Sequence, residues 1–313
     1  MKNFTSILFC AAVIALLAGC SKAKEEKAVS MQIKWMAGKQ YTNEMIMSQA
    51  SHMDVPGLPN AVDQITDVAQ SYTISALKDL PNGVTEMAMD FTAEKMLIRV
   101  GNNTVAASDS KTSAAGDNTN NVAAMLRRIV GAHFGYEMDA QGKASHITGV
   151  KEFFAHVPTE DNQGSSILKS MMSEDLIRQF ATRGQGLPPN PVKLGDHWKL
   201  HLEENAGSVG VLQMDLNYIF SGFENHDGHH CAAIDFNGTV MSKPSTNAAA
   251  MNITVEGGSI LGKMWFDPEL NMVMETGSDQ MMTMKILAQG KTIHSQMKQT
   301  VDIRMTGVGD LPK

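Results

Sequence analysis

Alternation of apolar and polar residues constrains the fold of this chain more than any other feature. Every second residue is apolar in two clear examples: Met214, Leu216, Tyr218 and Phe220, and then Val301, Ile303 and Met305. Successive side chains of a strand point to opposite faces, so a period of two predicts strands with one buried face. We therefore expect a mainly β (α+β) body.

Short turn sequences separate these alternating runs. They lie at residues 81–83 (Pro-Asn-Gly), 139–142, 227–228 (Asp-Gly) and 267–268 (Asp-Pro). Such turns join antiparallel neighbours, whereas parallel strands need a long crossover. The strands should therefore form antiparallel meanders.

An internal repeat divides the body. Shifting the chain by 145 residues places Gly83 on Gly228 and Asp90 on Asp235, each within a hairpin pattern. This predicts two similar halves, 31–155 and 192–308, on either side of a helical insert at 156–191. We expect them to form curved sheets or a half-barrel within one body, residues 31–313.

Two segments show a helical period. Apolar residues recur at three- and four-residue steps in 121–133, and at four-residue steps in 165–183. These patterns predict two or three amphipathic helices packed on one side of the sheet. The polar stretch 101–120 is expected to be a loop.

The N-terminal 20 residues have the organisation of an export signal. Lys2 is followed by an apolar run, 7–17, that is shorter than the ~20 residues needed to span a bilayer. Residues 17–20, Leu-Ala-Gly-Cys, resemble the lipobox of bacterial lipoproteins. The resemblance implies a signal peptide at 1–19, cleavage between Gly19 and Cys20, and acyl chains such as palmitate on Cys20.

Lipidation would place the protein in the cell envelope. Two or three acyl chains anchor stably in a bilayer, whereas a single chain binds reversibly. Residues 20–30 would comprise the lipidated cysteine and a flexible, charged tether. Ser21 rather than Asp at the next position favours the outer over the inner membrane.

Charge and cysteine content restrict the partners and the chemistry. The formal net charge is −7 and becomes −8 once Lys2 is removed with the signal, which argues against nucleic-acid binding. Cys10 would leave with the signal and Cys20 would carry lipid. Cys231 would then be the single thiol, so no intramolecular disulfide can form.

Three motifs resemble an uncharacterised family of secreted bacterial β-rich proteins. They lie at 32–41 (Gln-x-Lys-Trp-x-x-Gly-Lys-x-Tyr), 188–198 (Pro-Pro-Asn-Pro-Val-Lys-x-Gly-Asp-x-Trp) and 262–269 (Gly-Lys-x-Trp-Phe-Asp-Pro-Glu). The resemblance covers nearly the whole mature chain. It implies a fold and an exported location, with no assigned activity and no functional residues.

One cluster carries candidate metal ligands: His226, Asp227, His229 and His230. Imidazole and carboxylate groups bind zinc or copper. An Asp-Gly turn lies inside the cluster, however, so His229 and His230 should point to opposite faces of the returning strand. The simpler interpretation is an exposed hairpin tip, and a metal would need further ligands from elsewhere.

Other patterns that resemble catalytic motifs lack residues that the chemistry would need. Residues 257–263 imitate a phosphate-binding loop, but Met264 replaces the Ser or Thr that would hold magnesium. Asp90 and Asp235 each lie on the polar face of their predicted strand. The sequence contains no Gly-x-Ser-x-Gly elbow and no His-Glu-x-x-His pair, so we expect no cofactor besides the covalent lipid and favour a protein that is not an enzyme.

Methionine content suggests what such a protein could bind. The chain has 24 Met in 313 residues, and Met suits both irregular cores and surfaces that accept varied apolar partners. We expect binding of an apolar ligand or of an envelope protein. An envelope hydrolase with a site assembled from separated loops, and a structural or assembly lipoprotein, are the alternatives.

Overall fold

The structure is a computed structural model. It describes residues 27–112, 127–139, 142–155, 174–181, 184–205, 211–243, 251–288 and 290–312. Gly19 and Cys20, and with them the predicted signal peptide and lipidation site, lie outside this range.

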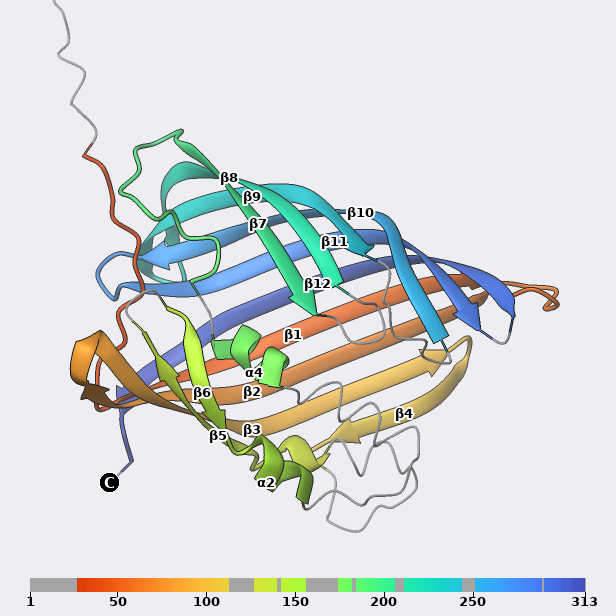
Figure 1. The fold of residues 1–313 in the computed structure, drawn as a ribbon, viewed down its shortest axis with the longest axis horizontal. Helices are drawn as coiled ribbons and strands as arrows, with labels where there is room; N and C mark the ends of the chain where they lie inside the picture. The colour runs from red at the N-terminus through yellow and green to blue at the C-terminus, as the bar shows by residue number, and fades with distance from the viewer. Residues whose placement is uncertain are drawn as a thin grey trace, which may run out of the picture.

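Twelve antiparallel strands form one large sheet (Figure 1). The strands are β1 (Lys39–Asp54), β2 (Val62–Leu80), β3 (Val84–Val100), β4 (Asn103–Asp109), β5 (His133–Met138), β6 (Ala144–Thr148), β7 (His197–Asn205), β8 (Val211–His226), β9 (His229–Lys243), β10 (Met251–Asp267), β11 (Met272–Ala288) and β12 (Lys291–Asp310). The predicted mainly β, antiparallel fold is confirmed.

Both predicted halves contribute consecutive strands to this sheet. Its order is β6-β5-β3-β2-β1-β12-β11-β10-β9-β8-β7, with β4 paired to the far end of β3. The first and last strands therefore meet in the middle, and β6 and β7 form two separate edges. The sheet is curved but open, as a half-barrel would be.

Each of the two repeated turns contains two consecutive residues with positive φ, although three residues connect β2 to β3 and two connect β8 to β9. The β2–β3 turn has Asn82 at φ 65° and Gly83 at φ 72°, and the β8–β9 turn has Asp227 at φ 49° and Gly228 at φ 85°. Asn, Asp and Gly are the residues that accept this left-handed conformation most readily. The repeat therefore located two hairpins, while their equivalence and the division of the whole body into two similar halves stay predictions.

Bulges at several strand pairs accompany the curvature. The register shifts between Thr42 and Asn43 on β1, between Phe220 and Gly222 on β8, and twice on β10, where one shift precedes Gly257. A bulge bends its strand and increases the local twist. The Gly257–Gly258 pair, which resembled a phosphate loop, is thus part of a bulge inside a strand.

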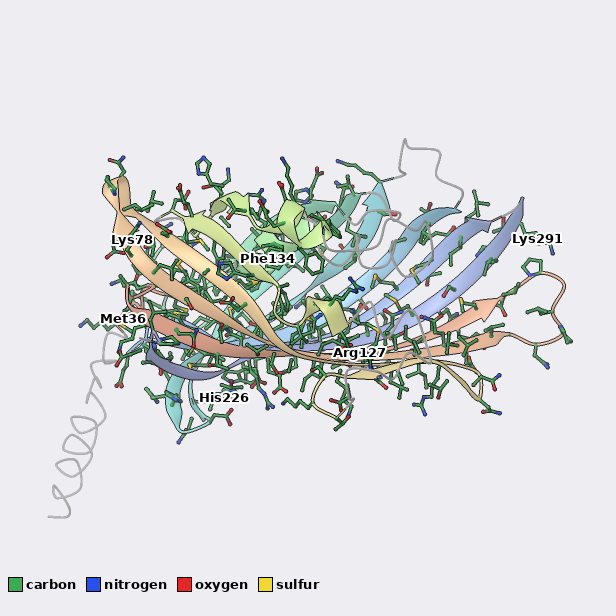
Figure 2. All side chains as sticks on the ribbon, turned by 90° about the horizontal axis from the view of Figure 1, so that it is seen from below. Met36, Lys78, Arg127, Phe134, His226 and Lys291 are labelled. Atoms are coloured by element: carbon green, nitrogen blue, oxygen red, sulfur yellow. The ribbon has the colours of Figure 1, made fainter. Side chains whose placement is uncertain are left out.

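The apolar face of the sheet is the concave one. Tyr41, Tyr72 and Met305 from β1, β2 and β12 belong to one buried cluster together with Ile129 and Ile177, which come from the short helical elements. Figure 2 shows these elements on the inner side of the curve. A second buried cluster, built on Tyr218, Phe236 and Phe266, continues the same face across β8, β9 and β10.

Two segments outside the sheet close one end of this interior. An isolated bridge joins Val29 to Val192, and Met31 beside it is buried in the second cluster. Trp198 stacks on Tyr218 at 5.6 Å between ring centroids and donates a hydrogen bond from Nε1 to the Gly186 carbonyl. The chain before β1 and the connector before β7 therefore pack against the concave face.

Helical structure is scarcer than expected. The described elements are α2 (Val150–Ala155), α4 (Glu174–Ala181) and two single 3-10 turns, η2 (Pro81–Gly83) and η3 (Arg127–Ile129). The second predicted helix, 165–183, is borne out over α4; its residues 165–173 lie outside the described part. Within the described ranges, no helix has the length and apolarity of a membrane span.

The predicted helix over 121–133 is wrong in its described part. Residues 127–129 form only the turn η3, and β5 begins at His133. The reason lies in tertiary pairing: Gly131 donates a backbone hydrogen bond to Phe91, and Phe91 donates one to Ala132, which ties this segment to β3. The predicted loop 101–120 is wrong as well over 103–109, which pair with β3 as β4.

A substitution at Gly262 on β10 can test how tightly the concave face is packed. A Cβ at this position would lie 2.2 Å from the Phe236 ring and 2.5 Å from the Gly277 carbonyl oxygen. We expect Gly262→Ala to destabilise the protein by about 1–3 kcal/mol, as overpacking does. Gly307→Ala on β12, where nothing lies within 4 Å, is the control and should cost less than about 0.5 kcal/mol. Equal urea midpoints for the two variants would contradict this packing.

Candidate functional site

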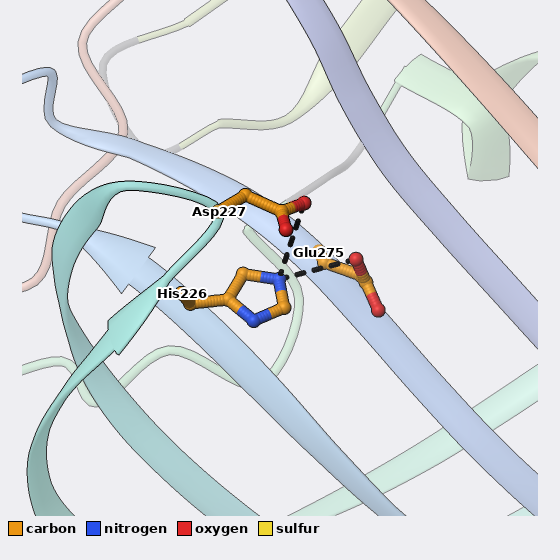
Figure 3. A group of neighbouring side chains, drawn as sticks. All are labelled: His226, Asp227 and Glu275. Atoms are coloured by element: carbon orange, nitrogen blue, oxygen red, sulfur yellow. Dashed lines mark hydrogen bonds and ion pairs between the residues drawn. The ribbon is translucent and has the colours of Figure 1, made fainter.

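The tip of the β8–β9 hairpin brings three potential metal ligands together. His226 Nε2 lies 3.1 Å from Glu275 Oε2 on β11 and 4.0 Å from Asp227 Oδ2 in the turn (Figure 3). The three ligand atoms all lie within 4.8 Å of one another. The side chains of His226 and Glu275 are each 18% exposed, so the pair is largely removed from solvent.

A second set of contacts fixes the His226 ring. The ring stacks on Trp265 of β10 with 4.1 Å between centroids and 10° between planes. Trp265 donates a hydrogen bond from Nε1 to Glu224, which also pairs with Lys263 Nζ at 2.9 Å. These two donors hold the pKa of Glu224 below its usual range. The ring of His226 is therefore pre-oriented with Nε2 toward the carboxylates.

Acidic groups are in excess around Glu275. Burial and a hydrogen bond to Glu275 raise the pKa of Asp302, on β12, to about 6. Arg304 on the same strand pairs with Glu44 of β1 at 2.7 Å. Among the described residues, no Lys or Arg forms an ion pair with Asp227, Glu275 or Asp302. Arg304 lies opposite Glu275 on the neighbouring strand and offsets part of the negative charge of Glu275 and Asp302.

A cavity of about 430 Å³ adjoins this cluster. It lies between the hairpin tip, with His226, Asp227 and His229, and the residues Arg304–Val308 at the end of β12. Its volume is within the range of small-molecule pockets. The cavity is therefore in contact with two of the three potential ligands, His226 and Asp227.

The sequence identified only part of this cluster. His226 and Asp227 lie together as predicted, whereas His229 Nδ1 turns to Asp267 at 2.8 Å and His230 stacks on Phe223 at 4.9 Å. The two latter histidines thus point to different partners, as strand alternation predicted. Glu275 was missed because it lies 49 residues away on a strand that does not neighbour β8.

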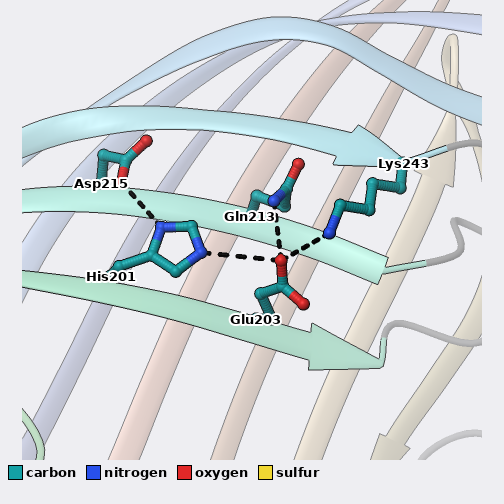
Figure 4. Close-up of polar contacts among 5 residues, drawn as sticks. All are labelled: His201, Glu203, Gln213, Asp215 and Lys243. Atoms are coloured by element: carbon teal, nitrogen blue, oxygen red, sulfur yellow. Dashed lines mark hydrogen bonds and ion pairs between the residues drawn. The ribbon is translucent and has the colours of Figure 1, made fainter.

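Other histidines form surface pairs with carboxylates. The largest group lies on β7, β8 and β9, where His201 Nδ1 contacts Asp215 at 2.7 Å and its Nε2 lies 3.6 Å from Glu203 (Figure 4). Glu203 also pairs with Lys243 at 2.6 Å, which lowers its pKa. The hydrogen bond to Asp215 raises the pKa of His201. The two carboxylates face opposite ring nitrogens, so they cannot share one ion with this imidazole.

The concave face provides a different kind of surface. In the middle of the sheet, β1, β11 and β12 direct six apolar side chains inward that are only half-buried: Met45, Met47, Met284, Met297, Val301 and Ile303. On the same strands the outward neighbours are polar or exposed; Met281 is 60% exposed, whereas the adjacent Met282 is 9% exposed. The predicted Met-rich face is therefore directed into the curve.

A row of glutamines crosses this apolar surface. Gln49, Gln299 and Gln280 are directly paired on β1, β12 and β11, and all three are half-buried. Met47 and Val301 lie on one side of the row, and Met297 and Met282 on the other. The rows on either side are mostly apolar but also contain Ser278, Ser51 and Ser295.

A buried carboxyl lies on the same face, at its β3 edge. Glu94 is 2% exposed and accepts a hydrogen bond from Ser108 Oγ at 2.9 Å, while its Oε1 has no hydrogen-bond partner among the described residues. Burial raises the pKa of this carboxyl above its usual value, against the opposing effects of Ser108 and Arg127.

The remaining candidates do not assemble a catalytic site in the described part of the chain. Asp90 on β3 pairs with His133, and Asp235 on β9 pairs with Ser221. Five strands separate β3 from β9 in the sheet, so the two carboxylates cannot act together. Cys231 is buried, and burial raises the pKa of its thiol to about 11, which makes it a poor nucleophile. No described hydroxyl or thiol hydrogen-bonds to His226, and the hydrolase alternative stays untested.

Comparison of sequences assigns the chain to a family. The profile of the family of unknown function DUF6263 matches residues 82–291, which is more than half of the chain, so the chain belongs to this family. A comparison with curated proteins finds no significant match.

Solved structures with a similar arrangement are distant. A structure described as showing lipid–protein interactions in lipovitellin has 10% identity and a TM-score of 0.48, covering 90% of this chain. The chain spans only 26% of that protein. An exported protein of Bacteroides fragilis with a YmcC-like fold has 11% identity, a TM-score of 0.29 and coverage of 90% and 100%. An outer membrane channel of Pseudomonas putida has 7% identity, a TM-score of 0.20 and coverage of 88% and 97%.

Glu94 gives a prediction about pH. Burial makes the pKa of Glu94 higher in the folded chain than in the unfolded chain. The stability that the protonated carboxyl contributes is therefore fully present below the pKa of the unfolded chain, and it is lost as pH rises through the pKa of the folded chain. Glu94→Gln keeps an acceptor for Ser108 without the charge. We expect this variant to be more stable than wild type at pH 7, with the difference shrinking toward pH 4 in urea unfolding.

The exposed Glu256 of β10 provides the control, since Glu256→Gln makes the same chemical change at the surface. A Glu94→Gln variant whose stability difference from wild type is the same at both pH values would disprove the effect of burial.

Proposed function

We propose that this member of the family is a lipid-anchored protein of the bacterial envelope that binds an apolar ligand on the concave face of its sheet. The observation that carries the proposal is the set of half-buried methionine, valine and isoleucine side chains directed into the curve on β1, β11 and β12. Soluble proteins seldom leave a continuous apolar surface open to solvent unless it binds something.

Methionine makes this surface adaptable. Its unbranched side chain has three rotatable bonds and a polarizable sulfur, so a methionine-lined surface accommodates ligands of varied shape. An acyl chain lying across the strands would contact Met47 and Val301 on one side and Met297 and Met284 on the other.

The glutamine row favours a ligand with one polar group. Gln49, Gln299 and Gln280 offer amide donors and acceptors in the middle of the apolar surface. Gln49 Nε2 already donates to Ser51 Oγ at 3.2 Å, but a purely apolar molecule would cover the amides of Gln299 and Gln280 without offering them a partner, which costs free energy. The chemical class that fits is therefore an amphipathic molecule such as a fatty acid or a lipid.

The anchor proposal rests on the lipobox resemblance of residues 17–20. Acyl chains on Cys20, followed by the charged tether, would hold the curved sheet close to a membrane that contains such ligands. The outer membrane is the favoured location because Ser21 follows Cys20.

Ligand binding can be tested with two methionines on opposite faces of the sheet. The protein expressed without residues 1–20 should bind a fluorescent fatty acid, and Met297→Glu should weaken binding at least tenfold because it places a charge on the concave surface. Met281→Glu, on the convex face of β11, is the matched control and should bind as wild type does.

Circular dichroism would verify that both variants are folded. If neither lipid nor probe binds to wild type, or if the two variants bind equally well, the proposed function is wrong.

Lipidation has its own test. In cells labelled with palmitate, the wild-type protein should incorporate the label and separate with the membrane fraction, whereas Cys20→Ala should do neither. Label retained in the Cys20→Ala variant would show that the anchor is not at this residue.

A further inference from the structure

The cluster at the β8–β9 tip carries an inference that is independent of the ligand on the concave face. We infer that His226, Asp227 and Glu275 bind a divalent transition-metal cation, of which Zn²⁺ is the representative. One imidazole nitrogen and two carboxylate oxygens from three different positions converge on a single point (Figure 3). These are ligand types that zinc prefers.

The distances between the ligand atoms are those of an ordinary hydrogen-bonded pair and are also compatible with a bound metal. Zinc binds nitrogen and oxygen ligands at ~2.0–2.2 Å, so the ligand atoms of a tetrahedral site are about 3.3 Å apart. The 3.1 Å and 4.0 Å separations from His226 Nε2 lie on either side of this value. A cation could therefore be coordinated if the exposed Asp227 side chain moved toward the other two ligands.

The groups around the three ligands are those that a metal site needs. Trp265 holds the imidazole plane by stacking, and Asp302 hydrogen-bonds to Glu275, so two of the three ligands have supporting contacts. The adjoining cavity supplies room for a water molecule or a small ligand in the fourth coordination position. Arg304 lies opposite Glu275 but forms its ion pair with Glu44, so no ion pair occupies the carboxylate of Glu275 on that side.

The surface group around His201 provides an internal comparison. It has the same residue types, but its carboxylates face different nitrogens of the ring and Lys243 already neutralises Glu203 (Figure 4). Convergence on one nitrogen therefore distinguishes the hairpin tip from an ordinary surface pair.

Metal binding would fasten the hairpin to the sheet. His226 and Asp227 belong to the β8–β9 tip, whereas Glu275 lies on β11, which is separated from β9 by β10. A cation bound only by the folded chain stabilises it in proportion to its concentration and affinity. Zn²⁺ should therefore raise the unfolding temperature as well as occupy the site.

The test is calorimetric titration of the full chain, purified in detergent and stripped of metal with a chelator, with zinc chloride at pH 7. We expect one Zn²⁺ per chain, a change in tryptophan fluorescence because Trp265 contacts His226, and a higher unfolding temperature. His226→Gln, Asp227→Asn and Glu275→Gln should each lower the affinity at least tenfold. His201→Gln should bind as wild type does.

Asp227→Asn guards against misfolding as an explanation, because Asn tolerates the left-handed turn conformation that Asp227 adopts. The absence of saturable Zn²⁺ binding to wild type would overturn the inference. The inference would also be overturned if His226→Gln and Asp227→Asn both bound Zn²⁺ with wild-type affinity. A loss of Zn²⁺ binding in His229→Gln alone would overturn it as well.

Discussion

The pairing of β1 with β12 is the interaction on which the rest of the structure depends. It runs from Lys39 opposite Asp310 to Asp54 opposite His294, along nearly the whole length of both strands. Because it joins the first strand to the last, it converts two separate meanders into one sheet and creates a continuous concave face. Without it, Met45 and Ile303 would lie at two open edges, and the first core cluster, which joins Tyr41 to Met272 and Met305, would be divided.

This pairing also explains the distribution of side chains between the faces. Directly paired residues lie on the same face, so Met47 with Val301 and Ser51 with Met297 extend the inner surface, while Glu44 with Arg304 extends the outer one. The same strands thus provide a largely apolar inner surface, which we propose binds an amphipathic molecule. Their outer surface is polar and includes Glu44 and Arg304.

Local features of the chain were predictable from sequence, and long-range ones were not. The alternation in 214–220 identified β8, and the Asp-Gly turn at 227–228 identified the hairpin, because both follow from the conformational preferences of neighbouring residues. The meeting of β1 with β12 and the approach of Glu275 to His226 depend on contacts between distant segments. The polar composition of 103–109 and the helical spacing before His133 were misleading, since pairing with β3 outweighed local preference.

A photoreactive fatty acid, irradiated in complex with the protein and located by mass spectrometry of its adducts, tests the central claim most directly. The proposed function predicts adducts on inward-facing residues of β1, β11 and β12, such as Met47, Met284 and Met297. Adducts on the convex face, for example at Met281, or a labelling pattern unchanged by excess unlabelled fatty acid, would contradict it.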